Sequence, residues 1–258
     1  MRYFLDLAYN GSPFHGWQSQ PNASSVQATI EEEISKLLGR KTNITGAGRT
    51  DTGVHARQMF VHFDYDKEIN DEIRFLQALN SMVGKNIVIR KLLPVPQEAH
   101  ARFDANERTY KYFVSYSKNP FLRDFSWFSP AHLSIDKMNA AASCLLTTYD
   151  FTSFAKLHSD AKTNICDVRK AEWKAIKDDI EAKDFLGLMD DGIVFTITAD
   201  RFLRNMVRAI VGTLVDVGRG KLSQYDFMNI INEKNRCSAG ISMPANALFL
   251  WKITYPYL

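Results

Sequence analysis

Short runs of alternating apolar and polar residues, separated by segments with apolar residues at helical spacing, fill the first half of the chain. Alternation is typical of half-buried strands, and a period near 3.6 is typical of amphipathic helices. The pattern predicts strands at 3–9, 57–65 and 87–93, and helices at 26–38 and 70–82. Ser24 with Gln27 forms a capping-box pattern before the first helix, and Gly39 is suited to end it. Asn70 is suited to cap the second helix.

The second half mixes strands and helices in the same way. The pattern predicts strands at 109–117, 168–174, 193–199 and 248–255, and helices at 134–146, 202–217 and 224–233. Pro94 and Pro96 end the strand 87–93 and mark a domain boundary near residue 105, because proline cannot continue a strand ladder. We therefore expect an α+β fold with two similar-sized lobes, residues 1–105 and 106–258, and the pattern leaves room for one shared sheet.

Composition narrows the class of protein. The chain has 258 residues, of which 45% are hydrophobic and 24% charged, as in soluble globular proteins. The three cysteines form no CxxC pair, so we expect a reducing, cytoplasmic setting. Arg2 is followed by three apolar residues before Asp6, and no apolar run approaches the roughly 20 residues of a membrane span, so we expect no secretory signal and no membrane helix. A net charge of +3 permits nucleic acid as a partner but does not require it.

Residues 46–55, Gly-Ala-Gly-Arg-Thr-Asp-Thr-Gly-Val-His, are the segment densest in candidate chemistry. The glycines give the backbone unusual freedom, and Asp51 stands between Arg49 and His55, two potentially cationic groups. A neighbouring cation favours the ionised carboxylate, which suits a nucleophile or a base. The segment lacks the Lys-Ser/Thr of a P-loop and the third glycine of GxGxxG. The alternative is a plain turn, with Asp51 bonded to local backbone and Arg49 on the surface.

A basic face is expected on the helix 202–217. Arg201, Arg204 and Arg208 follow at positions i, i+3 and i+7, so they share the face opposite the apolar stripe. Like charges at this spacing repel by roughly 0.2–0.5 kcal/mol per pair, so a phosphate, or a carboxylate from elsewhere, would relieve them. A solvated face without a partner is the alternative.

The predicted strand 109–117 is rich in tyrosine. Tyr110, Tyr112 and Tyr116 share one face, and Lys111 lies on the other. Such a strand suits unpaired RNA bases, because rings stack on bases and cations meet phosphates. A tyrosine-rich face packed on a helix is the alternative. The sequence contains no serine nucleophile elbow and no His/Cys spacing typical of a metal site, so we expect no metal.

Five segments are long, specific and arranged in a recognisable order. They are Tyr-Asn-Gly, Phe-His-Gly-Trp-Gln and Ser-Val-Gln within 9–27; Gly-Arg-Thr-Asp-Thr-Gly-Val-His-Ala at 48–56; Arg-Thr-Tyr-Lys-Tyr at 108–112; Asp-Phe-Thr-Ser-Phe at 150–154; and Asn-Met-Val-Arg through Val-Gly at 205–212. Together they resemble the tRNA pseudouridine synthase A family over nearly the whole chain.

The resemblance implies an enzyme that isomerises uridine to pseudouridine in RNA without a cofactor. It detaches uracil from C1′ of the ribose and rejoins it through C5. The implied substrate is the tRNA anticodon arm, at uridines 38, 39 and 40, and the target base must flip out of its stack. The implied fold has two α+β lobes with a joined, mainly antiparallel sheet, helices on one side, and an active-site cleft between the lobes. A homodimer is implied as well.

The resemblance also assigns roles to single residues. Asp51 matches the catalytic aspartate, which can add to the sugar carbon or take a sugar proton. Arg208 matches the arginine that pairs with this carboxylate, and Arg49 matches one that moves as the base flips out. Tyr110 matches the tyrosine that stacks on the uracil, and Leu248 lies at the base pocket. Residues expected to contact the RNA are Phe14, His15, Gln18, Arg57, Arg102, Arg108, Lys111, Arg201, Arg204 and Asn205.

Three positions depart from the family pattern. Thr52 stands where alanine is usual, Ala247 where glycine is frequent, and Cys166 where an arginine is common, a contact that could move to Arg169. Two other functions stay open. A non-catalytic RNA-binding protein would share the same surface but would give no reason for the glycine-bounded Asp51. A glycosidic-bond hydrolase usually needs a second carboxylate, and no motif nominates one.

Overall fold

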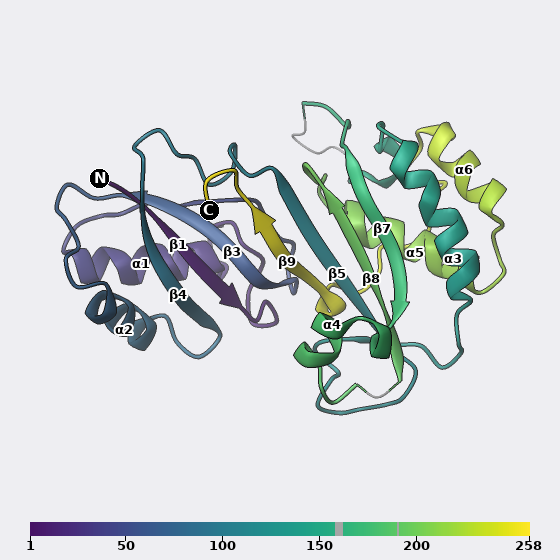
Figure 1. Cartoon of the computed structure of the whole chain (residues 1–258), viewed down its shortest axis with the longest axis horizontal. Coiled ribbons are helices and arrows are strands. Elements are labelled where there is room, and N and C mark those ends of the chain that lie inside the picture. Colours follow the sequence, from purple (N-terminus) through teal and green to yellow (C-terminus); the bar gives the residue numbers. More distant parts are fainter. Residues whose placement is uncertain (158–161, 190) are drawn as a thin grey trace. The chain divides into compact units, whose positions relative to one another are not determined.

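The computed structural model describes residues 1–157, 162–189 and 191–258, and it confirms the α+β class. These residues form two compact units, drawn with the rest of the chain in Figure 1. Unit 1 comprises Met1–Asn106 together with Leu250–Leu258, and unit 2 comprises Glu107–Phe249. The C-terminal residues thus belong with the N-terminal unit, although the expected second lobe ran from 106 to 258.

The sheet of unit 1 is built around two antiparallel pairings of its first strand. Its strands are β1 (Arg2–Tyr9), β2 (Thr45–Gly46), β3 (His55–Asp64), β4 (Ile87–Val95) and the end of β9 (Leu248–Thr254). β1 lies between β3 and β4, so that Leu5 faces Val61 on one side and Leu92 on the other. The sequence predicts that this strand ends before Pro94, but β4 continues through Pro94 to Val95. The edge position explains this, because a proline on an outer strand costs no ladder hydrogen bond.

Two helices, α1 (Val26–Leu38) and α2 (Glu72–Met82), lie on one side of this sheet (Figure 1). Ser25 rather than Ser24 caps α1, by accepting a hydrogen bond from Ala28 N–H. Gly39 ends α1 in the left-handed conformation, as predicted. Asp71 rather than Asn70 caps α2. Each cap differs by one residue because neighbouring polar residues compete for the same position.

The C-terminal segment is tied to unit 1 by hydrogen bonds from backbone and side-chain groups. Ile253 N–H donates to Gln58 Oε1, and Asn106 N–H donates to the Thr254 carbonyl. Tyr255 donates its hydroxyl to the Ala101 carbonyl and packs edge-on against the ring of Phe60. These bonds explain why the last residues complete the first unit.

The strands of unit 2 pair mainly antiparallel and are covered by helices. Its strands are β5 (Glu107–Ser115), β6 (Trp127–Phe128), β7 (Val168–Ala175) and β8 (Gly192–Ala199). β8 lies between β5 and β7, with Phe195 opposite Tyr112 and Trp173. Its helices are α3 (Ile135–Ala142), α4 (Ile180–Phe185), α5 (Met206–Gly218) and α6 (Gln224–Glu233), with 3₁₀ turns at Ser143–Thr147, Thr152–Phe154, Ile176–Asp178 and Ala245–Ala247.

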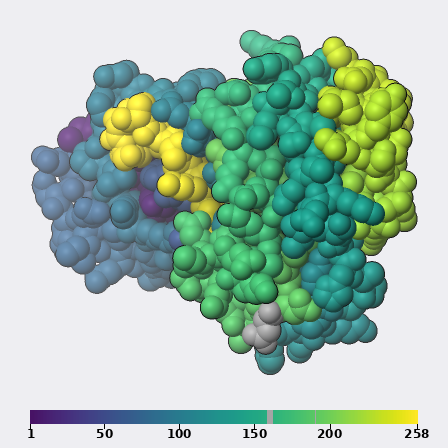
Figure 2. All heavy atoms as spheres, turned by 45° about the vertical axis from the view of Figure 1, so that its right-hand side comes forward, coloured from purple at the N-terminus to yellow at the C-terminus, as the bar shows by residue number. Residues whose placement is uncertain are grey.

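Helices α3, α5 and α6 pack together beside β7 and β8 (Figure 1). Figure 2 shows α6 in yellow-green at the surface, next to residues of α3 in teal. The predicted bounds of α6 are confirmed, whereas α5 begins at Met206 instead of residue 202. The helix expected at 134–146 ends at Ala142 and continues only as a 3₁₀ turn. Among the described residues, no helix is long and apolar enough to cross a membrane.

Candidate active site

The loop that carries Asp51 connects β2 to β3 in unit 1. Asp51 is half-buried, whereas Arg49 is exposed. Val54 N–H donates to the Asp51 carbonyl at 3.1 Å, which closes a turn around Asp51. Gly53 has φ = +79° within this turn, a conformation that favours glycine. The carboxylate therefore stands on a tight turn between two strands.

A second segment, residues 10–17, fixes this turn from outside. Trp17 N–H donates to the Thr50 carbonyl at 3.1 Å, and the hydroxyls of Tyr9 and Thr50 lie 2.8 Å apart. The backbones come so close that a Cβ on Gly11 would lie 2.0 Å from the Val54 carbonyl oxygen. Gly16 has φ = +91°, and a Cβ there would lie 2.7 Å from the Thr50 carbonyl oxygen. Glycines of one loop thus fix the backbone on both sides of Asp51.

His55 is a hydrogen-bond acceptor and not the cation that the sequence suggested. Its side chain is 1% exposed, and Gly11 N–H donates to its Nδ1 at 3.0 Å. A nitrogen that accepts a hydrogen bond carries no proton, so the imidazole is neutral at Nδ1. His55 therefore joins the two loops, and the prediction that it is a second cation beside Asp51 is corrected.

The N-terminal loop exposes some of its expected RNA contacts and buries others. His15 and Gln18 are exposed. Phe14 and Trp17 are buried, and a Cβ on Gly46 would lie 2.7 Å from the Trp17 ring. The ring of Phe14 thus belongs to the interior of unit 1, so its predicted RNA contact is corrected.

In unit 2, Arg208 lies in the first turn of α5 and is half-buried. Its Nε donates to the Met243 carbonyl at 2.6 Å, and Met243 N–H donates to the Arg208 carbonyl at 3.1 Å. Arg201 and Arg204 precede the helix, so the three arginines share no helix face. The repulsion expected from helical spacing is therefore wrong, because the helix starts later than its apolar pattern suggests.

The tyrosine strand divides into two environments. Tyr110 is half-buried and meets the Phe202 ring edge to face, with the ring centroids 5.1 Å apart. Tyr112 is fully buried, and its hydroxyl has no hydrogen-bond partner among the residues that the structure describes. Burial raises the pKa of Tyr112. Leu248 is buried at the start of β9, directly after the 3₁₀ turn Ala245–Ala247. Tyr110 and Tyr116 thus combine an aromatic ring with partial exposure, whereas Tyr112 does not.

Lys111 was expected to meet RNA, and the structure contradicts this. The side chain is 4% exposed, and its Nζ lies 2.6 and 2.7 Å from the carboxylate oxygens of Asp179. Burial acts to raise the pKa of Asp179, but the hydrogen bonds from Lys111 and from Ala182 N–H outweigh it and lower the pKa. Asp179 precedes α4, a helix that the sequence pattern did not predict. The ammonium is therefore already paired inside unit 2, and its RNA contact is corrected.

The remaining expected RNA contacts are distributed over both units. In unit 1, Arg57 lies over the Trp251 ring and Arg102 over the Phe103 ring. In unit 2, Arg108 donates to the Asp200 carbonyl, and Asn205 donates from Nδ2 to Ser242 Oγ. Arg204 is exposed.

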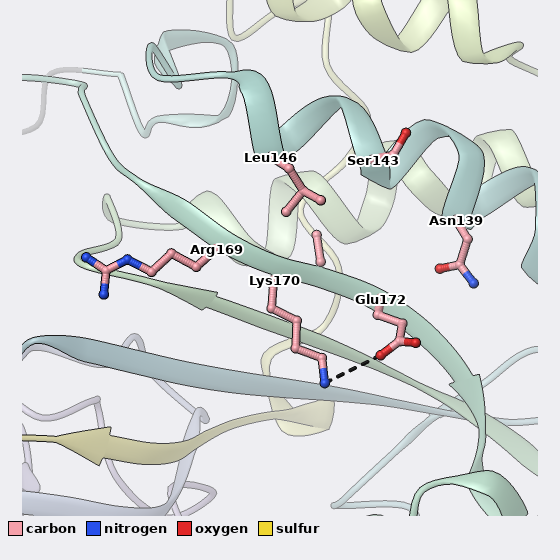
Figure 3. A pocket seen from close by; sticks show the side chains of 7 residues that line it. Asn139, Ser143, Leu146, Arg169, Lys170 and Glu172 are labelled. Carbon is pink, nitrogen blue, oxygen red and sulfur yellow. Dashed lines mark ion pairs between the residues drawn. The ribbon is translucent and has the colours of Figure 1, made fainter.

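A surface pocket of about 410 Å³ lies at the outer edge of β7, beside α3 (Figure 3). Its lining includes an ion pair between Lys170 and Glu172, with the charged atoms 3.4 Å apart. Arg169, to which the contact expected at Cys166 could move, lines it, but none of the residues assigned to catalysis or base binding does. Among the described residues, no group of three or more His, Cys, Asp or Glu could hold a metal ion.

Comparison with known proteins identifies the family. The family model described as tRNA pseudouridine synthase matches residues 7–104 and 141–256, which include Asp51, Arg208 and Leu248. The chain therefore belongs to the tRNA pseudouridine synthase family.

Curated relatives agree over almost the full length. The tRNA pseudouridine synthase A of Parabacteroides distasonis is 49% identical over 255 residues, which cover 99% of this chain and 96% of that protein. The protein of the same name from Bacteroides fragilis is also 49% identical, with the same coverage. The one from Caldicellulosiruptor bescii is 38% identical over 97% of this chain and 98% of that protein.

Proposed function

We propose that this protein isomerises uridine to pseudouridine in tRNA and that Asp51 is its catalytic carboxylate. Family membership supports the reaction, and the construction of the Asp51 turn supports the residue. In the reaction, the C1′–N1 bond breaks and a C1′–C5 bond forms, while C5 loses a proton and N1 gains one. The product has the same atoms as the substrate, so the reaction consumes no second reactant.

The fixed backbone around Asp51 is the observation that carries this proposal. Gly11 and Gly16 contact the carbonyls on either side of it at distances that no side chain would permit. A half-buried carboxylate on such a turn is held in one place but stays open to a substrate. This arrangement suits attack on the sugar carbon and removal of a sugar proton equally well.

Unit 2 supplies the other groups of the proposed site. Tyr110 presents a partly exposed ring on which the target uracil can stack, and Arg208 pairs with the Asp51 carboxylate. Leu248 borders the base. The target must leave its stack to reach Asp51, and Arg49 is exposed and able to move as the base flips out.

The proposed substrate region is the anticodon arm, at uridines 38, 39 and 40. Residues proposed to contact the RNA are His15, Gln18, Arg57, Arg102, Arg108, Arg201, Arg204 and Asn205. We also propose that the protein acts as a homodimer in the cytoplasm, without metal or other cofactor.

Release of tritium from tRNA labelled at C5 of uridine tests the reaction, because C5 loses its hydrogen when it bonds to the sugar. We expect Asp51→Asn, which keeps the shape of the side chain, to release tritium at least about 10³-fold more slowly. Thr52→Ala is the matched control, since Thr52 is exposed and next in the chain; its rate should stay within about twofold of the wild type.

Each other outcome identifies a rival function. Binding of tRNA without tritium release by the wild-type protein would indicate a non-catalytic RNA-binding protein. Free uracil in the supernatant would indicate a hydrolase. Unchanged tritium release by Asp51→Asn would show that the protein isomerises uridine but that Asp51 is not its catalytic carboxylate.

A further inference from the structure

Residues 236–243 lie along the first turns of α5, which carry Arg208. Gly240 N–H donates to Thr213 Oγ1 at 2.9 Å, and Met243 N–H donates to the Arg208 carbonyl at 3.1 Å. A Cβ on Gly212 would lie 1.9 Å from the Ile241 carbonyl oxygen, so the segment rests directly on the helix backbone. We refer to residues 236–243 as the strap.

The hydroxyl of Ser242 accepts hydrogen bonds from two side chains, one outside the strap and one at its beginning. Ser242 Oγ accepts a hydrogen bond from Asn205 Nδ2 at 2.6 Å and another from an Arg236 guanidinium nitrogen at 2.9 Å. The other terminal nitrogen of Arg236 donates to the Gly240 carbonyl at 3.1 Å. Ser242 therefore connects the residue before α5 to the beginning and the end of the strap.

Asn205 is held in a conformation that needs support from its surroundings. It has φ = +67°, in the left-handed region, and its side chain does not cap α5. Such a backbone costs free energy for a residue other than glycine, although asparagine tolerates it better than most. The hydrogen bond to Ser242 is therefore a partner that keeps the entrance of α5 in this conformation.

The strap ends on the guanidinium of Arg208. The Met243 carbonyl, next to Ser242, accepts the Arg208 Nε hydrogen bond at 2.6 Å. A guanidinium is planar, so fixing Nε also fixes the direction of its two terminal nitrogens. The position of the Met243 carbonyl thus decides where Arg208 presents its remaining donors.

We propose that Ser242 is a positioning residue for Arg208. Its hydroxyl binds Asn205 outside the strap and Arg236 at the beginning of the strap, and so places the Met243 carbonyl that orients the guanidinium. This inference rests on the proposed function, in which Arg208 pairs with the Asp51 carboxylate. Neither the family match nor the sequence pattern singled out Ser242, which lies in an irregular segment.

The surroundings of Ser242 separate positioning from folding. The side chain is half-buried, and the adjacent Ile241 is 74% exposed, so little apolar surface depends on this part of the strap. Loss of one partly exposed hydroxyl should therefore leave the folded protein nearly as stable. A misplaced guanidinium should instead slow the chemical step, because catalysis depends on orientation within about 1 Å.

The test compares Ser242→Ala with Ser238→Ala, a matched control in the same strap whose hydroxyl makes no hydrogen bond to the residues that the structure describes. We expect Ser242→Ala to lower kcat for tRNA about tenfold, with KM within about twofold and Tm within about 2 °C of the wild type. Ser242→Thr, which keeps a hydroxyl, should recover most of the activity. Ser238→Ala should match the wild type.

A double-mutant cycle tests whether Ser242 acts through Arg208. Lysine has no Nε–H, so in an Arg208→Lys background the Met243 carbonyl has no guanidinium to orient. There, Ser242→Ala should have less than about a twofold effect on kcat. An equal effect in both backgrounds, or equal rates for Ser242→Ala and Ser238→Ala, would overturn the inference. Failure of the proposed reaction would instead appear as absence of activity in the wild-type protein, or as unchanged activity in Asp51→Asn. The two failures can therefore be distinguished.

Discussion

The Asp51 turn of unit 1 and the start of α5 in unit 2 are both held in one conformation. In both, a glycine lets two backbones touch, but the side-chain groups that complete the contact differ. In unit 1, Gly11 and Gly16 allow two backbones to touch, and the neutral imidazole of His55 accepts a backbone N–H. In unit 2, the charged side chains of Arg208 and Arg236 reach across to carbonyls and to a hydroxyl.

The same contrast extends beyond the proposed site. In unit 1, His62 is buried and accepts the Ala101 N–H at its Nδ1, beside the ring of His100. In unit 2, buried Lys111 forms a charged pair with Asp179. Both units should therefore be sensitive to added volume at their close-packed glycines, whereas protonation of a buried histidine should affect unit 1. Unit 2 should be most sensitive to the loss of single charged groups.

Adding one methyl group to Gly11 should have the largest effect. The Cβ of Gly11→Ala would lie 2.0 Å from the Val54 carbonyl oxygen, so one loop must move away from the other. We expect the free energy of unfolding to fall by at least about 3 kcal/mol, with loss of isomerase activity. Gly48→Ala is the control, since a Cβ there has no atom within 4 Å and the free energy of unfolding should be unchanged. Denaturant unfolding of both variants gives the comparison, and equal stabilities would contradict the close approach of the two loops.

Removing the ammonium of Lys111 should have the second-largest effect on stability. Lys111→Met leaves the Asp179 carboxylate without its partner, which we expect to lower the free energy of unfolding by about 3 kcal/mol. Affinity for tRNA and its dependence on salt should not change, because Lys111 is paired inside unit 2. Exposed Lys137 offers a control substitution to Met with little effect on stability. A reduced salt slope for Lys111→Met alone would restore the RNA contact that the structure contradicts.

Protonation of His62 should have the smallest of these effects, and it should appear only in unit 1. Burial lowers the pKa of His62 from 6.5 to about 4. Between these values the unfolded chain binds the proton more readily, so stability is present above pH 6.5 and is lost as the pH falls towards 4. We expect a loss of about 2 kcal/mol, allowing for solvent screening.

Asp179 contributes to the pH dependence of stability at lower pH than His62 does. Its pKa is depressed below the ordinary 3.8, so its contribution is lost only as the pH falls below that value. Hydrogen exchange resolved by unit, at pH 6.5 and pH 4.5, should therefore show weakening in unit 1 alone. His62→Gln should reduce that pH dependence, leaving the part due to His100, whose pKa burial also lowers, whereas His15→Gln, at an exposed position, should keep it in full. Equal weakening of both units would contradict the contrast between neutral and charged anchors.

Sequence periodicity predicted the regular elements because it depends on local burial. The bounds of α6 follow from apolar spacing alone, and so does the presence of the strand that carries Tyr110, although β5 begins and ends two residues before the predicted 109–117. The start of α5 did not, because Leu203 fits the apolar stripe while the chain becomes helical only after the left-handed Asn205. Lys111 was misassigned because its partner follows 68 residues later and precedes a six-residue helix with no strong signal.

The candidate site was predictable where a motif carries it and not where packing does. Asp51, Arg208 and Tyr110 follow from segments whose order resembles one family. The parts played by Gly11, His55 and Ser242 depend on contacts between segments up to 44 residues apart, which no local pattern encodes. Glycines in the loop 10–24 were the only local signal of the close approach.

The most direct test of the central claim is to map pseudouridine along an unmodified tRNA transcript after incubation with wild-type protein and with Asp51→Asn. We predict modification by the wild type at uridines 38, 39 or 40 and at no other position, and none by Asp51→Asn at equal concentration of folded protein. Modification by Asp51→Asn at the wild-type rate would contradict the role of the fixed carboxylate. Modification outside the anticodon arm would contradict the proposed substrate.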